Sequence, residues 1–383
     1  MKKIYFLFSL SLLHFNYSKA QYCNPPSSSI ELNYNNVNAL VHNGGDMFWD
    51  LLGNPRYEVP KGSGINPLFA AGLWLGGLDS NDSLHLAAIR YRSNGNDFFP
   101  GPLNNSGTVD SNTCYLFNRI FAVTQNEIIS HLAGDSTSPS ILEWPAKGNP
   151  NISLPNQDLA PFIDVNGDGL YNPDHGDYPK IKGERALWWV FNDAGNLHSE
   201  TGGEAIGVEV QVMAYAYSTN DALDNTTLFD YKVINKGESL HEFYLGQFVD
   251  PDLGNPIDDF IGCDTVQGIG IAYNGDSYDE DNSGALGYGS NPPVMGISAI
   301  NTPRINNQNY SLSHFIYYNS GVSVIGSPNL PNEYYGYMKG QWKDGTHLKY
   351  GGTGHTSGSW SQVNTNYMFP GEPNNTNSWN ECT

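Results

Sequence analysis

The sequence has little positive charge and no long apolar stretch beyond its first 20 residues. Lys and Arg together number 18 against 39 Asp and Glu, which gives a formal net charge of −21. Nucleic acids and anionic membrane surfaces bind basic faces, so we expect neither as a partner. The main apolar run covers residues 4–13, whereas a membrane-spanning helix needs about 20 such residues. The chain is therefore not expected to span a membrane.

Motifs of common enzyme classes are also missing. The chain has four cysteines and no CxxC pair, which disfavours a zinc ribbon or a thioredoxin-type site. It has no HExxH and no GxSxG, the motifs of zinc proteases and of α/β-hydrolases. We therefore assign no catalytic residue from the sequence.

The first 20 residues are typical of a secretory signal peptide. Lys2 and Lys3 form a basic start, residues 4–13 are apolar, and Ser18 and Ala20 place small residues before a cut after Ala20. The mature chain would begin at Gln21 and be secreted, either extracellular or at the cell surface. The four cysteines, Cys23, Cys114, Cys263 and Cys382, would then form at least one disulfide. Three pairings of all four are possible, and the sequence does not choose among them.

Alternating apolar and polar residues predict a mostly β protein. Residues 207–217, 227–234 and 242–249 alternate at period two and are separated by turn residues. Residues 68–75 and 84–91 are expected to form a hairpin, and residues 120–131 a helix capped by Thr124. The predicted fold class is antiparallel β-sandwich domain(s) with long loops and few short helices.

Composition divides the predicted chain into three parts. After the signal peptide at 1–20, we expect an N-terminal β-rich domain at 21–160 and a β-sandwich domain with acidic loops at 161–383. The boundary follows a segment rich in Pro, Asn and Ser at 139–161, which is typical of a linker.

The loop 164–177 has the spacing of a calcium loop. Asp164, Asn166 and Asp168 supply oxygen at positions 1, 3 and 5, and Gly169 at position 6 turns the chain so that the Leu170 carbonyl follows. His175 stands where an EF-hand has Glu, so we predict a stand-alone loop. Either of two later carboxylates could close it, Asp174 or Asp177. The alternative interpretation is an acidic surface turn.

A second acidic cluster follows a predicted strand and is the second candidate calcium site. Its carboxylates are Asp250, Asp252, Asp258, Asp259 and Asp264. Hard divalent cations bind such oxygens, and close carboxylates repel one another without a cation or solvent between them. A third run at 276–281 could contribute to this site. The alternative is a solvated loop.

An ordered set of short motifs resembles the N-terminal region of large secreted surface proteins exported by the type IX secretion system. The motifs lie at 71–77, 97–103, 164–173, 176–179, 188–193, 250–254 and 258–265. The resemblance implies a location at the cell surface and no specific chemistry. Such proteins generally continue into a C-terminal sorting domain, which residues up to 383 do not contain. We therefore expect either a fragment or another export route.

Two function classes remain open from the sequence. The first is a secreted or cell-surface calcium-binding β protein with a structural or adhesive role, whose partners would be carbohydrate or other surface proteins. The second is a secreted polysaccharide-directed hydrolase or its carbohydrate-binding accessory region. Trp74, Trp188, Trp189 and Trp342 could stack on sugars if they were exposed, although most are expected in the core.

Overall fold

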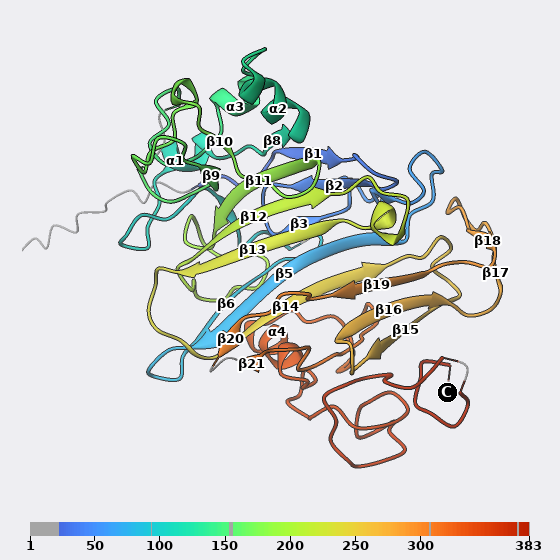
Figure 1. Cartoon of the computed structure of the whole chain (residues 1–383). Helices are drawn as coiled ribbons and strands as arrows, with labels where there is room; N and C mark the ends of the chain where they lie inside the picture. Colours follow the sequence, from blue (N-terminus) through green and yellow to red (C-terminus); the bar gives the residue numbers. More distant parts are fainter. Residues whose placement is uncertain (1–22, 93, 153–155, 306–307, 374, 383) are drawn as a thin grey trace, which may run out of the picture.

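The computed structural model describes residues 23–92, 94–152, 156–305, 308–373 and 375–382. Within them the chain is mostly β, and its sheets are antiparallel with few short helices, as predicted (Figure 1). The predicted signal peptide lies outside the described residues. No helix in the described ranges combines the length and apolar character needed to cross a membrane.

The first large sheet has β14 at one edge and β1 at the other. Strand β5 (Leu68–Leu78) pairs with β6 (Leu84–Ala88), which confirms the predicted hairpin, and also with β14 (His241–Pro251) from far along the chain. The remaining strands are β1 (Ser29–Leu32), β2 (Asn38–His42), β3 (Asp46–Met47) and β4 (Tyr57–Glu58).

The second large sheet is built on three long strands. They are β11 (Arg185–Asn192), β12 (Val208–Ala216) and β13 (Leu228–Asn235), joined at one side by β7 (Phe99–Pro100) and β8 (Phe121–Thr124). Both large sheets therefore combine strands from before and after residue 160. The expected domain boundary at residue 160 therefore does not coincide with the division between these two sheets.

The two large sheets pack face to face around one core. Leu73 and Val41 from the first sheet share a buried apolar cluster with Trp189, Val210 and Val212 from the second. All nine residues of β12 are buried, since it is a central strand with both faces covered. This packing gives the β-sandwich that the alternating strands predict.

The predicted helix at 120–131 is partly a strand. Residues 121–124 form β8 because they pair with β11, and α2 (Gln125–Ala133) begins only after Thr124. Thr124 and Glu127 form the expected capping box. The other α-helices are α1 (Ser111–Leu116), α3 (Pro139–Leu142) and α4 (Pro331–Met338). The segment predicted as a linker instead contains α3 and packs Ile141 and Trp144 into a core.

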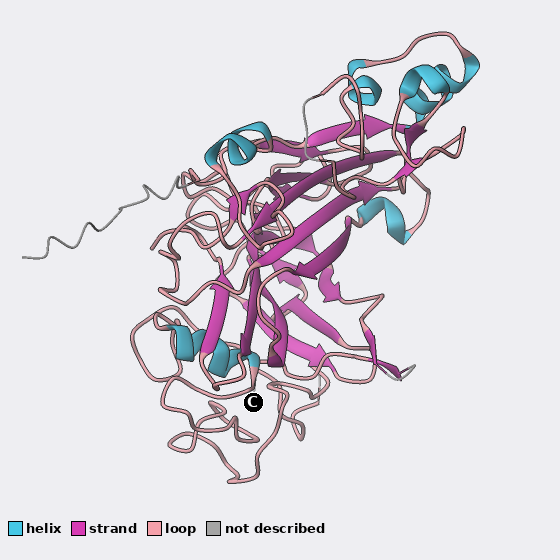
Figure 2. Ribbon diagram, turned by 90° about the vertical axis from the view of Figure 1, so that its left-hand side faces the viewer, coloured by secondary structure: helices cyan, strands magenta, loops and turns pink. Residues whose placement is uncertain are grey.

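A third sheet and several loops complete the molecule at one end (Figures 1 and 2). The sheet consists of β15 (Asp259–Asp264), β16 (Ile269–Asn274) and β19 (Val294–Ser298). Three two-stranded ribbons lie outside the larger sheets. They are β9 (Phe162–Ile163) with β10 (Tyr178–Pro179), β17 (Tyr278–Asp279) with β18 (Gly289–Ser290), and β20 (Arg304–Ile305) with β21 (Gln308–Asn309).

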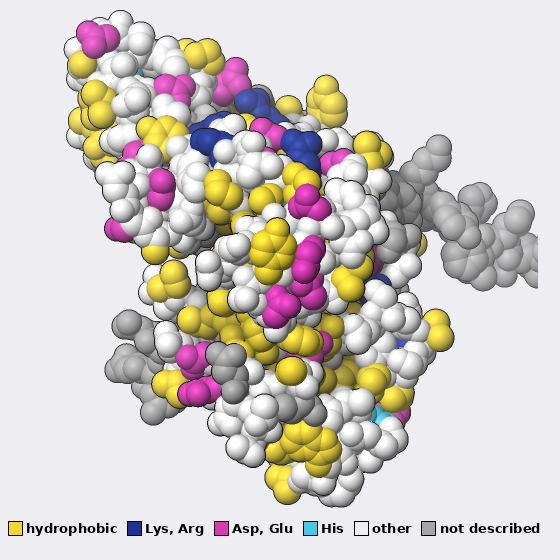
Figure 3. Space-filling model, turned by 90° about the vertical axis from the view of Figure 1, so that its right-hand side faces the viewer, with side chains coloured by type: hydrophobic (Ala, Val, Ile, Leu, Met, Phe, Trp, Pro, Cys, Tyr) yellow, Lys and Arg dark blue, Asp and Glu magenta, His cyan; other side chains and the backbone are white. Residues whose placement is uncertain are grey.

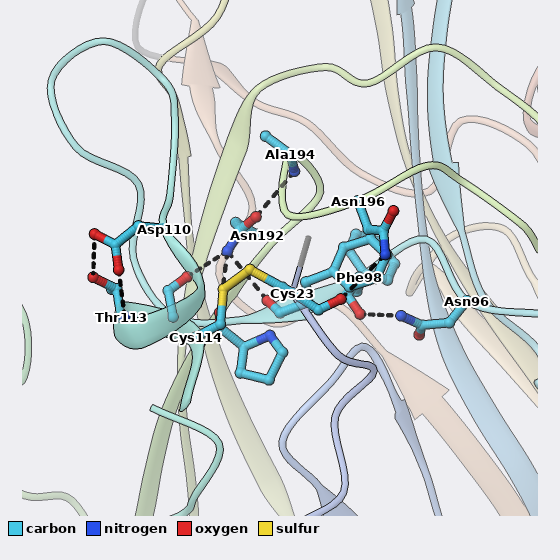
Figure 4. Close-up of a disulfide and its surroundings, with 12 residues drawn as sticks. Cys23, Asn96, Phe98, Asp110, Thr113, Cys114, Asn192, Ala194 and Asn196 are labelled. Atoms are coloured by element: carbon cyan, nitrogen blue, oxygen red, sulfur yellow. Dashed lines mark hydrogen bonds between the residues drawn. A yellow bond between two sulfur atoms is a disulfide. The ribbon is translucent and has the colours of Figure 1, made fainter. Parts of the chain in front are cut away.

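A disulfide joins Cys23 to Cys114 in α1, as Figure 4 shows. The bond fixes the first described residue to a helix 91 positions further along the chain. The main-chain carbonyl of Cys23 also accepts a hydrogen bond from the Asn196 side chain at 3.2 Å. Cys263 is a buried free thiol and Cys382 an exposed one. The prediction of at least one disulfide is thus met, and the pairing that the sequence left open is Cys23 with Cys114.

Candidate metal centres

The loop 164–177 is closed by a short ribbon. Ile163 of β9 pairs with Tyr178 of β10, so the residues on either side of the loop lie next to each other. Inside the loop, Asp164 accepts hydrogen bonds from the main-chain N–H groups of Gly167 at 2.7 Å and Gly169 at 2.8 Å. Both glycines have positive φ, near +75° and +79°, a conformation that glycine adopts without a steric penalty. The chain thus wraps around the Asp164 carboxylate.

The next two predicted ligands lie together in the same turn. The Asn166 side-chain amide donates to Asp168 Oδ2 at 2.8 Å, and Leu170 N–H donates to Asp168 Oδ1 at 2.8 Å. These bonds hold the Asp168 carboxylate in its charged form and lower its pKa. The structure therefore brings together the side chains at positions 3 and 5, while the Asp164 carboxylate at position 1 is held by main-chain N–H groups of the same loop.

Of the two carboxylates considered for closing the loop, Asp177 is the one whose hydrogen bonds span it. It is fully buried and accepts from Val165 N–H and from Asn172 N–H, both at 2.8 Å. Asp174 lies in an exposed 3₁₀ turn, and its N–H donates to the Asn172 side chain. Asp177 therefore fixes the shape of the loop from the inside, whereas Asp174 lies on its surface.

The second cluster has a buried part near the end of β14. Asp250 accepts a hydrogen bond from the Tyr91 hydroxyl at 2.8 Å, and burial raises its pKa. Burial, together with the nearby charge of Asp250, raises the pKa of Asp252 to about 7. Burial also raises the pKa of Asp259 to about 8, and the charges of Asp258, Asp279 and Asp252 add to this effect. These carboxylates lie close enough to disfavour one another's charge.

Asp264, the last predicted ligand, does not belong to this group. It ends β15 at the opposite end from Asp259 and caps the turn into β16 by accepting from Val266 N–H and Gln267 N–H. These hydrogen bonds lower its pKa. Asp279 of the third acidic run lies near this group, because its charge acts on Asp259. It is 1% exposed and accepts from Asn255 N–H and Tyr288 N–H.

No three His, Cys, Asp or Glu side chains of the described ranges form a group that could hold a metal ion by themselves. A cation at either place would therefore also need amide, main-chain or water oxygens. Calcium accepts such mixed oxygen ligands. The donor set of the loop 164–177, with one amide and one main-chain carbonyl among its predicted ligands, is of this kind.

Figure 3 faces the side of the molecule where β17 and β18 lie. Asp and Glu side chains gather there in small groups, while the Lys and Arg side chains in view lie mostly nearer the top. On this face the acidic groups are therefore spread over several places, whereas the basic groups are fewer.

One buried polar network was missed by the sequence analysis. Arg90 donates to Glu200 at 3.1 Å, and the Tyr334 hydroxyl donates to the same carboxylate oxygen at 3.1 Å. Burial raises the pKa of Glu200, while the Arg90 charge acts in the opposite direction. No local signal marks these residues, because they come from three distant segments.

A shallow hollow of about 340 Å³ lies beside the third sheet. Phe260 and Tyr273 line it with ring centroids 6.0 Å apart, together with Asp276 and Cys382. It has one carboxylate in its lining, whereas glycoside hydrolysis uses two. Trp74, Trp188, Trp189 and Trp342 are buried in cores and do not form a sugar-stacking face.

Comparisons with protein-family models, with curated proteins and with solved structures give no match. The resemblance to proteins exported by the type IX system therefore stays a prediction from the motifs alone.

Proposed function

We propose that this chain is a secreted or cell-surface, calcium-binding β protein with a structural or adhesive role. The observation that supports the proposal is the loop 164–177, a turn closed by β9 and β10 in which main-chain N–H groups enclose the Asp164 carboxylate and the Asn166 amide contacts Asp168. The signal-peptide pattern and the Cys23–Cys114 disulfide support an oxidising, extracellular location. The motif resemblance to type IX cargo points to the cell surface.

Calcium binding would increase the stability of the folded protein. Extracellular calcium modules have dissociation constants of about 0.1–1 mM. At a few millimolar calcium, one such site adds on the order of 1 kcal/mol to the free energy of unfolding. For a chain of this size, that corresponds to a rise in the melting temperature of a few degrees. Calcium would thus stabilise a fold that its apolar cores already specify.

The experiment is thermal unfolding of the mature protein in calcium, in magnesium and in chelator at equal ionic strength. We expect the highest melting temperature in calcium and a smaller rise in magnesium, which demands a more rigid octahedral site. Identical curves in all three conditions would contradict the proposal. Intact-mass measurement of the exported protein tests the location separately, with Gln21 expected as the first residue.

A second candidate function is carbohydrate binding at the hollow lined by Phe260 and Tyr273. Two aromatic rings beside polar groups are suited to stacking on a sugar ring. This favours the accessory-region alternative over the hydrolase. Calorimetry of soluble oligosaccharides with the wild-type protein and with a Phe260→Ala variant tests carbohydrate binding at this hollow. Equal heats of binding for both proteins would reject this site.

A further inference from the structure

Asp259 and Asn274 face each other across two paired strands. They are direct partners in the antiparallel register of β15 and β16. Directly opposite residues project their side chains to the same face, with Cβ atoms about 4.5–5.5 Å apart. The two side chains are therefore neighbours.

Both side chains carry a buried oxygen that accepts no hydrogen bond. Among the described residues, Oδ1 of Asp259 and Oδ1 of Asn274 have no donor. Asn274 is only 8% exposed, and its amide nitrogen is directed to the main-chain oxygens of Asp276 and Tyr278. A buried acceptor without a partner destabilises the folded state, because it has lost its hydrogen bonds to water. Two of them on adjacent residues indicate that a positively charged or donating group belongs between them.

The surroundings favour a cation over a neutral donor. Asp252, Asp258 and Asp279 all act electrostatically on Asp259. In the part of the chain that the structure describes, no Lys, Arg or His forms an ion pair with any of these four carboxylates. Repulsion among them is relieved if a divalent cation binds there.

The loop before β15 is shaped around one of these carboxylates. Gly254 has φ near +79°, and a Cβ at this position would lie 2.1 Å from Asp279 Oδ2. The chain can thus approach Asp279 this closely only with glycine here. Asn255 N–H then donates to Asp279 Oδ1, and the Asn255 side chain donates to Asp258. The acidic side chains are therefore held by a built loop.

We propose that Asp259 Oδ1 and Asn274 Oδ1 are ligands of a second calcium ion, with Asp279, Asp258 and Asp252 providing the negative charge around it. Calcium takes carboxylate, amide, main-chain and water oxygens in flexible geometry, and main-chain carbonyls or water would complete the shell. The inference deepens the proposed calcium dependence, but it does not rest on the loop 164–177. The competing explanation is a proton on Asp259 that is donated to Asn274.

Asp259→Asn separates the two explanations. The substitution removes the charge but supplies an N–H group that can satisfy Asn274 Oδ1. Asp264→Asn is the matched control, because it makes the same change at the other end of the same strand. Asp168→Ala reports on the loop 164–177 separately. Each protein is titrated with calcium by calorimetry, and its melting temperature is measured in calcium and in chelator.

We expect wild type and Asp264→Asn to bind two calcium ions per chain, and Asp259→Asn and Asp168→Ala to bind one each. Asn274→Asp, which adds a carboxylate, should lower the melting temperature in chelator and widen the gap between chelator and calcium. The inference is overturned if the Asp259→Asn variant binds as many calcium ions as wild type. It is also overturned if wild type shows no second calcium site and the Asp259→Asn variant is more stable than wild type in chelator. Loss of calcium binding in Asp168→Ala alone would support the loop and reject this second site.

Discussion

Arg90 and Glu200, 110 residues apart in the sequence, form a buried ion pair with Nε 3.1 Å from Oε1. Their side chains are 6% and 0% exposed. Arg90 also lies over the ring of Tyr334 in α4, 5.2 Å from its centroid. The pair therefore connects the end of the β6 segment, the loop before β12 and the helix that covers the first sheet.

Replacement of Arg90 by Met should strongly destabilise the fold. Glu200 would keep a buried charge without its partner, which costs about 3–5 kcal/mol. Adding Glu200→Gln should recover part of this loss, because the remaining group is neutral. The exposed pair Arg56–Glu31 is the control, and Arg56→Met should cost about 0–1 kcal/mol. Urea unfolding measures all four proteins, and similar losses in Arg56→Met and Arg90→Met would contradict the prediction.

The effect of Arg90→Met should depend on pH. Burial raises the pKa of Glu200 in the folded protein above its unfolded value. The stability contributed by this group is then fully present below the unfolded pKa and falls as pH rises through the folded pKa. Without Arg90 the folded pKa rises further, so the deficit relative to wild type should be larger at pH 8 than at pH 5. Urea unfolding at both pH values tests this, and a deficit independent of pH would count against it.

Loss of the Cys23–Cys114 disulfide should lower stability by about 2–5 kcal/mol, because the bond closes a long loop of the unfolded chain. The variant is Cys23→Ser with Cys114→Ser, measured by thermal unfolding against wild type. Cys382→Ser removes an exposed free thiol and serves as the control, with no expected change. Equal melting temperatures for the double variant and wild type under oxidising conditions would refute the stabilising role.

Replacement of Asp177 and replacement of Asp168 by Ala should change the melting temperature in different ways. Asp177→Ala leaves the N–H groups of Val165 and Asn172 without their acceptor, so it should lower the melting temperature in calcium and in chelator alike. Asp168→Ala changes an exposed side chain and should mainly reduce the rise produced by calcium. Thermal unfolding of both variants in the two conditions provides the comparison. A response to calcium that is unchanged in Asp168→Ala would remove this loop from the proposal.

Gly254→Ala should be more harmful than Gly284→Ala. Both glycines have positive φ, near +79° and +101°, so alanine is strained at each by about 1 kcal/mol. At Gly254 the new Cβ would also collide with Asp279, whereas at Gly284 no atom lies within 4 Å. The difference in the free energy of unfolding between the two variants measures how closely the loop approaches Asp279. Equal losses would mean that this approach is not required.

The local structure of this protein follows from short stretches of its sequence. Alternating side chains specified the strands β12, β13 and β14, because an extended chain places successive side chains on opposite faces. That both faces of β12 are buried depended on the packing of the whole chain. Thr124 and Glu127 specified where α2 begins, and the spacing of 164–177 specified a wrapped turn, since these depend on residues within a few positions of one another.

Which distant segments meet depends instead on the packing of the whole folded chain. The pairing of β5 with β14, the choice of Cys114 as the partner of Cys23, and the ion pair of Arg90 with Glu200 all depend on how buried faces fit together. The same applies to the strand at 121–124, where pairing with β11 outweighed the local helical pattern. The second acidic cluster shows most clearly that proximity along the chain does not determine proximity in the fold. The sequence grouped Asp264 with Asp259 by proximity along the chain, whereas the hairpin register placed Asn274 opposite Asp259 and left Asp264 at the far end of the strand.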